Sequence, residues 1–161
     1  VQLHQVGDYP KDFGDRARAI GGAAWEKGYS ARAHWVHEFK EFPNHAIFNG
    51  VKSFKVDDGW LTKMRFTKEM TGITPLLRTW NPKTPPKKED REDIVAWAFE
   101  RPNGGRSVTF TGAHLHASFA EEGYRKFLTN SILWTAKVDV PKDGAKVDLD
   151  ATKLGDYLKK K

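Results

Sequence analysis

The chain contains no cysteine among its 161 residues. Disulfide bonds, cysteine-ligated metal sites and a cysteine nucleophile are therefore excluded, while the redox compartment stays open. The sequence also lacks a run of about 18 apolar residues, the length that a membrane-spanning helix needs. We therefore expect no membrane partner.

Several sequence motifs of common enzyme classes are also missing. There is no phosphate-binding P-loop and no G-x-G-x-x-G dinucleotide fingerprint. None of Ser107, Ser118 and Ser131 lies in a G-x-S-x-G elbow, which argues against a serine hydrolase. The common nucleotide-binding and serine-hydrolase motifs therefore give no lead to function.

The chain opens on VQLHQV, without a methionine, a basic segment or an apolar segment typical of a signal peptide. We expect either a processed chain or a piece of something longer. A secreted or periplasmic location stays open, since a signal could have been removed.

Aromatic residues are plentiful, at 12% of the chain with six tryptophans and ten phenylalanines. This composition and length predict one folded domain over residues 1–161. The net charge is +6, and residues 153–161 carry half of it, because four lysines there stand against Asp156 alone. A basic terminal segment over residues 150–161 explains this excess better than a nucleic-acid groove does, so we expect no nucleic-acid partner.

Strands and helices are expected to mix along the chain. Residues 103 and 104, Asn-Gly, predict a hairpin turn with positive-φ positions between two strands. Ser118, with Glu121 three residues on, predicts a capping box at the start of the best helix. This order favours an α/β layer fold, whose sites lie beyond the carboxyl ends of strands. The expected strands are residues 1–4, 28–38, 51–56, 60–66, 73–80, 94–100 and 107–111, and the expected helices are 12–25, 119–136 and 150–161, with an extended segment at 137–149.

The stretch TGAHLHAS carries the strongest site signal. His114 follows Gly112, whose missing side chain lets the backbone approach a ligand closely. An imidazole titrates near neutral pH, so His114 is a candidate acid–base group, although a histidine that caps the next helix fits equally well. His116 lies on the same face if the segment stays extended. His4 ends the first strand, where the same edge of the sheet could hold it near His114.

A metal site is an alternative for the same residues. His114 and His116 could hold a divalent ion such as zinc. His4, His34 or His37 would supply a third nitrogen, and Asp57 or Asp58 an oxygen.

Two further features could bind a substrate. Asp57-Asp58-Gly59 is predicted to be a turn before the strand of Trp60, with a functional role open for Asp58. Trp60 is a candidate for stacking on a sugar ring, as are Trp25, Trp35 and Trp97. Most tryptophans are core residues, so the core alternative stays open for each of them.

The chain resembles the trehalose-utilisation (ThuA-like) family over most of its length. The segment RPNGGRSVTFTGAHLHASFAEEGYRKFLTNSILWTAK is similar to the family's closing pattern. NHAIFNGVKSFKVDDGW and VQLH resemble two earlier segments more loosely. The matching residues are Gly105, Arg106, Gly112, His114, Phe119, Tyr124, Arg125, Leu128, Asn130, Ile132, Leu133 and Trp134, with His45, Ile47, Gly50, Phe54, Asp58 and His4 upstream.

The resemblance implies a flavodoxin-like, class I glutamine-amidotransferase-like layered sheet with flanking helices. It also implies a protein acting on a disaccharide or a 3-keto-glycoside, as a hydrolase or an isomerase. Amidotransferase chemistry is not implied, because His4 lies near the elbow where those enzymes carry a cysteine. The implied functional set is His4, Asp58 and His114, with His34, Trp60 and Gly112 as substrate-binding candidates.

Two departures from the family pattern bear on this expectation. The family's glutamate after the aspartate is Gly59 here, and its tyrosine two positions further on is Leu61. A non-catalytic carbohydrate-binding relative is therefore the alternative, and a binder of anionic polymers a third. The family's first strands are also absent, so an incomplete domain is expected, whose open sheet edge would be covered by a missing N-terminal segment or a second copy.

Overall fold

A computed structural model describes residues 1–4, 10, 13–83 and 93–150. Its central sheet has four strands in the order β1-β8-β7-β6. These are β1 (Gln2–Leu3), β6 (Ile73–Thr79), β7 (Asp93–Glu100) and β8 (Arg106–Phe110). β1 runs parallel to β8, while the β8–β7 and β7–β6 pairs are antiparallel. The α/β class expected from the sequence is therefore present as a mixed sheet with helices.

The predicted hairpin between β7 and β8 is confirmed. Ala96 pairs with Phe110 at one end and Glu100 with Arg106 at the other. The predicted turn geometry is wrong in part, since Gly104 has a left-handed φ of 76° whereas Asn103 is not among the positive-φ residues. Asn103 contributes through its side chain instead, whose oxygen accepts from the backbone N–H of Gly105 at 3.0 Å.

A second antiparallel pair, β3 (Ala31–Phe39) with β4 (Phe54–Thr62), matches nine residues on each strand. The predicted turn at Asp57-Asp58-Gly59 is wrong, because these residues lie in the middle of β4. Asp58 faces Trp35 and Gly59 faces His34 across the pair. Long-range pairing with β3 therefore overrides the local turn preference of the Asp-Asp-Gly sequence.

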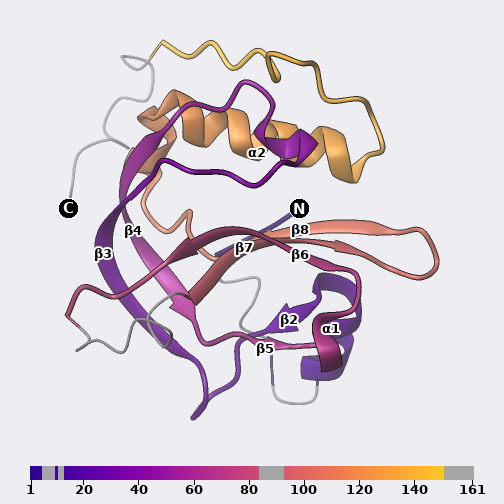
Figure 1. The fold of residues 1–161 in the computed structure, drawn as a ribbon. Helices are drawn as coiled ribbons and strands as arrows, with labels where there is room; N and C mark the ends of the chain where they lie inside the picture. Colours follow the sequence, from indigo (N-terminus) through magenta and orange to yellow (C-terminus); the bar gives the residue numbers. More distant parts are fainter. Residues whose placement is uncertain (5–9, 11–12, 84–92, 151–161) are drawn as a thin grey trace.

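One helix covers each face of the central sheet (Figure 1). α1 (Gly14–Gly21) lies on one face beside the small pair β2 (Ala23–Ala24) and β5 (Arg65–Phe66). α1 is much shorter than the predicted helix over 12–25, since Gly22 adopts a left-handed φ of 83° and ends it. Only part of its apolar surface is buried, since Ala17 is 2% exposed whereas Ile20 is 56% exposed.

The other face carries α2 (Glu122–Thr135), which also packs on the 3-10 turn η3 (Ala46–Phe48). α2 begins later than the predicted 119, because a separate 3-10 turn, η6 (His116–Ala120), precedes it. The predicted capping box is wrong, since Glu121 occupies the cap position without a side-chain hydrogen bond. A further 3-10 turn, η4 (Lys68–Met70), lies between β5 and β6.

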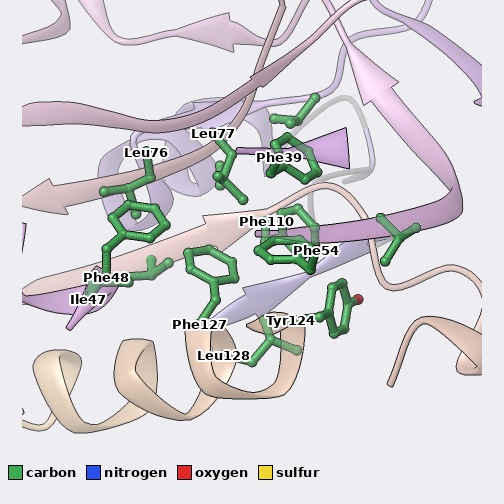
Figure 2. Close-up of a cluster of buried hydrophobic side chains, with 14 of the residues drawn as sticks. Phe39, Ile47, Phe48, Phe54, Leu76, Leu77, Phe110, Tyr124, Phe127 and Leu128 are labelled. Carbon is green, nitrogen blue, oxygen red and sulfur yellow. The ribbon is translucent and has the colours of Figure 1, made fainter. Parts of the chain in front are cut away.

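An aromatic core fills the space between α2, β8 and the β3–β4 pair (Figure 2). Phe110 contacts Phe127 and Tyr124 with ring centroids 5.5 and 5.7 Å apart. Phe48 stacks on Phe127 from η3 at 5.5 Å. Such packed rings hold β8 and β4 rigidly, and these are the strands that carry the site.

Residues 136–150 follow α2 along its outer side without forming a strand (Figure 1). Asn130 of α2 is buried and holds this segment, because its side-chain oxygen accepts from the backbone N–H of Ala145 at 2.8 Å. The same side chain donates to the carbonyls of Ile47 and Asn49. The predicted helix at 150–161 lies outside the described residues, apart from Asp150. None of the helices in the described part of the chain is long and apolar enough to cross a membrane.

Candidate functional site

The carboxylate of Asp58 is fully buried and organises the loop that follows β8. Its two oxygens accept hydrogen bonds from five groups, which occupy the lone pairs of an ionised carboxylate. We therefore assign Asp58 a positioning role, since its oxygens face the loop and leave no lone pair for a substrate. The five donors are the backbone N–H groups of Gly59 (2.8 Å), Ala113 (3.0 Å), His114 (2.9 Å) and Leu115 (3.1 Å), and the hydroxyl of Ser118 (3.1 Å).

The Asp58 carboxylate also holds the backbone of the loop after β8 in an unusual conformation. Ala113 has a φ of 70°, a left-handed conformation that costs an L-residue about 1–2 kcal/mol. The N–H groups of Ala113 and His114 both point at Asp58 as a result. The charge-assisted hydrogen bonds offset the strain, and they orient the backbone from which the His114 side chain projects.

His4 and His114 are in direct contact. Nε2 of His4 lies 2.8 Å from Nδ1 of His114, and the ring centroids are 4.5 Å apart. Nδ1 of His4 lies 2.9 Å from the carbonyl oxygen of Thr111. His4 itself has a left-handed φ of 47°, and His114 directly follows the left-handed Ala113. The expectation that His114 and His4 would meet at one edge of the sheet agrees with this arrangement.

The partners of the two rings determine where their protons lie. A carbonyl oxygen can only accept, so Nδ1 of His4 must carry a hydrogen and donate it to Thr111. In the neutral ring Nε2 of His4 is then an acceptor, and Nδ1 of His114 must be its donor. Nε2 of a neutral His114 is consequently left without a proton. This hydrogen-bonded chain therefore presents His114 Nε2 as a base.

The electrostatics favour the same form of His114. Partial loss of solvent around the ring lowers the pKa of His114 below that of an ordinary histidine, and the nearby charges of His4 and His34 lower it further. The charge of Asp58 opposes this with a smaller upward effect on the pKa. The ring therefore loses its proton more readily than a free imidazole, as a general base at neutral pH requires.

A third imidazole completes the cluster. His34 projects from β3, and its ring centroid lies 4.7 Å from that of His114 with an interplanar angle of 63°. His34 and His114 are both exposed to solvent. The cluster is therefore a surface site, and the cavity of about 390 Å³ beside His37 and Trp80 is lined by none of its three imidazoles.

The described residues do not form the predicted metal site. No three of their His, Asp and Glu side chains are placed to hold one ion. Two nitrogens on one tetrahedral zinc would lie roughly 3.3 Å apart, given zinc–nitrogen distances of ~2.0–2.1 Å. The 2.8 Å between His4 and His114 is a hydrogen-bond distance instead. His116 lies in η6, apart from this contact, so the donor set does not fit a shared ion in this arrangement.

Trp60 and Gly112, which were also predicted to bind a substrate, are buried and belong to the core. Trp60 has no exposed surface, and its indole N–H donates to the carbonyl of Trp35 at 3.0 Å. A sugar ring therefore cannot stack on it, and the core alternative holds for Trp60. Gly112 is buried, and a Cβ there would lie 2.5 Å from the ring of Phe110, so its missing side chain makes room for the core rather than for a ligand.

Sequence reasoning missed three contributors to the site. Thr111 acts through its carbonyl, Ser118 through a hydroxyl assigned to a helix cap, and Ala113 through its left-handed backbone. Tyr124 also lies close enough for the charge of Asp58 to affect it. Its pKa is raised mainly by burial and further by that charge, and its hydroxyl has no hydrogen-bond partner among the described residues. Of the three missed contributors, only Ser118 was singled out in the sequence, and then as a helix cap.

Comparison with models of known families, with curated proteins and with solved structures found no match for this chain.

Proposed function

We propose that this protein is a ThuA-like, carbohydrate-active protein in which the His4–His114 pair moves protons on a disaccharide or a 3-keto-glycoside. The hydrogen-bonded chain from the Thr111 carbonyl through His4 to His114 carries this proposal. A general base at neutral pH needs a fixed tautomer and an unprotonated ring, and the lowered pKa of His114 favours the unprotonated ring. The choice of a disaccharide or a 3-keto-glycoside as the substrate comes from the sequence resemblance.

The same proposal includes a flavodoxin-like, amidotransferase-like arrangement of the sheet. Its support is the parallel pairing of β1 with β8, followed by α2 on one face of the sheet. His4 and His114 both follow the carboxyl ends of these two parallel strands, the place where open α/β sheets bind ligands.

The alternative is a relative that binds carbohydrate without turnover. It is favoured by the saturated carboxylate of Asp58 and by the absence of a side chain at Gly59. Leu61 is buried and supplies no hydroxyl. The catalytic proposal therefore depends on imidazoles alone.

Nuclear magnetic resonance of the protein with trehalose and with its 3-keto form separates the two functions. The catalytic proposal expects conversion of one sugar, and loss of that conversion in His114→Gln and in His4→Gln. Saturation-transfer signals from a bound but unchanged sugar would support the alternative. No binding and no conversion across a panel of disaccharides and their keto forms would refute both.

A further inference from the structure

Gly59 lies beneath the contact between two of the three imidazoles. A Cβ built on Gly59 would lie 2.9 Å from Nε2 of His34 and 3.0 Å from Cβ and from Cγ of His114. The φ of Gly59 is not in the left-handed region, so the backbone itself does not require glycine. Glycine is therefore needed here for space, because His34 and His114 both occupy the volume that a side chain would fill.

The position of His34 is fixed by the sheet. His34 faces Gly59 across the β3–β4 pair, in the middle of nine matched residues. Its neighbour Trp35 is buried and donates its indole N–H to Thr79 at 2.8 Å, which holds the strand in register. The His34 ring thus reaches over the bare Gly59 backbone and meets His114 edge to face.

We propose that His34 is a second proton-transfer residue acting on the same ligand as His114, and that Gly59 is the positioning residue that admits it. This inference rests on the proposed function, and it gives the site an acid as well as a base. In the step, His114 Nε2 takes a proton from the carbon next to the keto group of a 3-keto-glycoside, and the electron pair of the broken C–H bond forms the double bond of an enediol whose former keto oxygen is protonated. A protonated His34 gives a proton to an oxygen of the same sugar, so one proton leaves and one enters.

The closeness of the two rings disfavours both being protonated at the same time. Two imidazolium rings with centroids 4.7 Å apart repel each other, so one proton shared by the pair is favoured over two. His4 is already engaged in the hydrogen-bonded chain, because its Nδ1 donates to the carbonyl oxygen of Thr111. His34 has no hydrogen bond of that kind to a carbonyl in the described structure. Its Nε2 lies over Gly59, so Nδ1 is the ring nitrogen left for a ligand. His34 is thus the imidazole of the cluster best placed to act as the acid.

The test uses His34→Gln and Gly59→Ala in the full chain. Their controls are His37→Gln, an imidazole on the same strand in contact with Phe39 and Trp80, and Gly14→Ala, where the nearest atom to a new Cβ is 3.5 Å away. The ring of His114 is titrated by nuclear magnetic resonance. Both test variants should raise its pKa toward that of an ordinary histidine, and both controls should leave it unchanged.

The second readout is the conversion of the 3-keto form of trehalose. His34→Gln should lower kcat on the order of tenfold or more while the dissociation constant of the sugar changes little. An unchanged kcat, or an unchanged His114 titration, in His34→Gln would overturn the inference. If Gly59→Ala does not fold, His34→Gln alone decides it.

The two proposals fail in different ways. If the wild-type protein neither binds nor converts a sugar, the proposed function fails, and the His114 titration then decides alone whether the two rings are coupled. If the wild type converts the sugar and His34→Gln converts it equally fast, the proposed function stands and the role of His34 is refuted.

Discussion

Nε2 of His4 lies 2.8 Å from Nδ1 of His114, although 110 positions separate the two residues in the chain. The parallel pairing of β1 with β8 brings them together, since Leu3 pairs with Phe110 and each histidine follows shortly after. The Thr111 carbonyl then selects the tautomer of His4. The short strand β1 at the edge of the sheet therefore brings the two histidines into one hydrogen-bonded pair with a defined tautomer.

The first prediction compares the three histidines of this region. On the proposed function, His114→Gln and His4→Gln should lower sugar conversion by about a hundredfold or more, within the range for loss of an acid–base group. His116→Ala should change it by a few-fold at most, since His116 takes no part in the His4–His114 contact. Steady-state rates on the 3-keto form of trehalose measure this. A His116→Ala variant that loses both its activity and bound metal would restore the metal alternative.

The second prediction concerns Asp58. Asp58→Asn should reduce the free energy of unfolding by roughly 2–5 kcal/mol, because an amide cannot accept from five donors and leaves buried N–H groups unsatisfied. Asp57→Asn, one residue earlier on the same strand and only half-buried, is the control and should cost much less. Urea unfolding followed by tryptophan fluorescence gives both values. Equal losses in the two variants would contradict the positioning role of Asp58.

The third prediction is a dependence of stability on pH. Burial lowers the pKa of His114 and of His45 in the folded protein relative to an ordinary histidine. The unfolded chain therefore binds more protons between the lowered pKa values and about 6.5, and stability rises with pH through that window. We expect the free energy of unfolding to fall as the pH drops from about 7.5 to about 5.

His45→Gln provides the matching variant for this pH effect. The variant should flatten that fall, since His45 is the more buried of the two and no longer has to be protonated on unfolding. Its stability at neutral pH should also drop, because Nδ1 of His45 accepts from the N–H of Ile47 at 3.2 Å and caps η3. Denaturant titrations at several pH values test both statements. If the free energy of unfolding of His45→Gln falls as steeply with decreasing pH as that of the wild type, this would argue against a lowered pKa at His45.

The fourth prediction concerns Asn130, which joins α2 to two other segments. Asn130→Ala should lower the free energy of unfolding by roughly 2–4 kcal/mol, because it leaves two carbonyls and one N–H group without their buried partner. Asn44→Ala, on the surface, should be nearly neutral. Thermal unfolding of the two variants separates them, and similar melting temperatures would refute this role.

The sequence by itself determined the elements whose signals are local. The β7–β8 hairpin follows from alternating strands around a Gly104 turn, and the position of β3 follows from the alternation in SARAHWVHEF. Most of α2 follows from an apolar stripe that includes Tyr124, Phe127 and Leu128. Such signals depend on residues within a few positions of one another, so they can be recognised in one sequence without knowledge of the fold.

Only the tertiary structure decided the roles at the site. Asp58 was expected in a turn with a functional role, but pairing with β3 places it in a strand, where five donors saturate it. His4, His34 and His114 were each recognisable as candidates, whereas their contact depends on β1 lying beside β8 and on β3 lying beside β4. Hydrogen bonds and ring contacts act over a few ångströms, and only the folded chain brings these distant residues within that range.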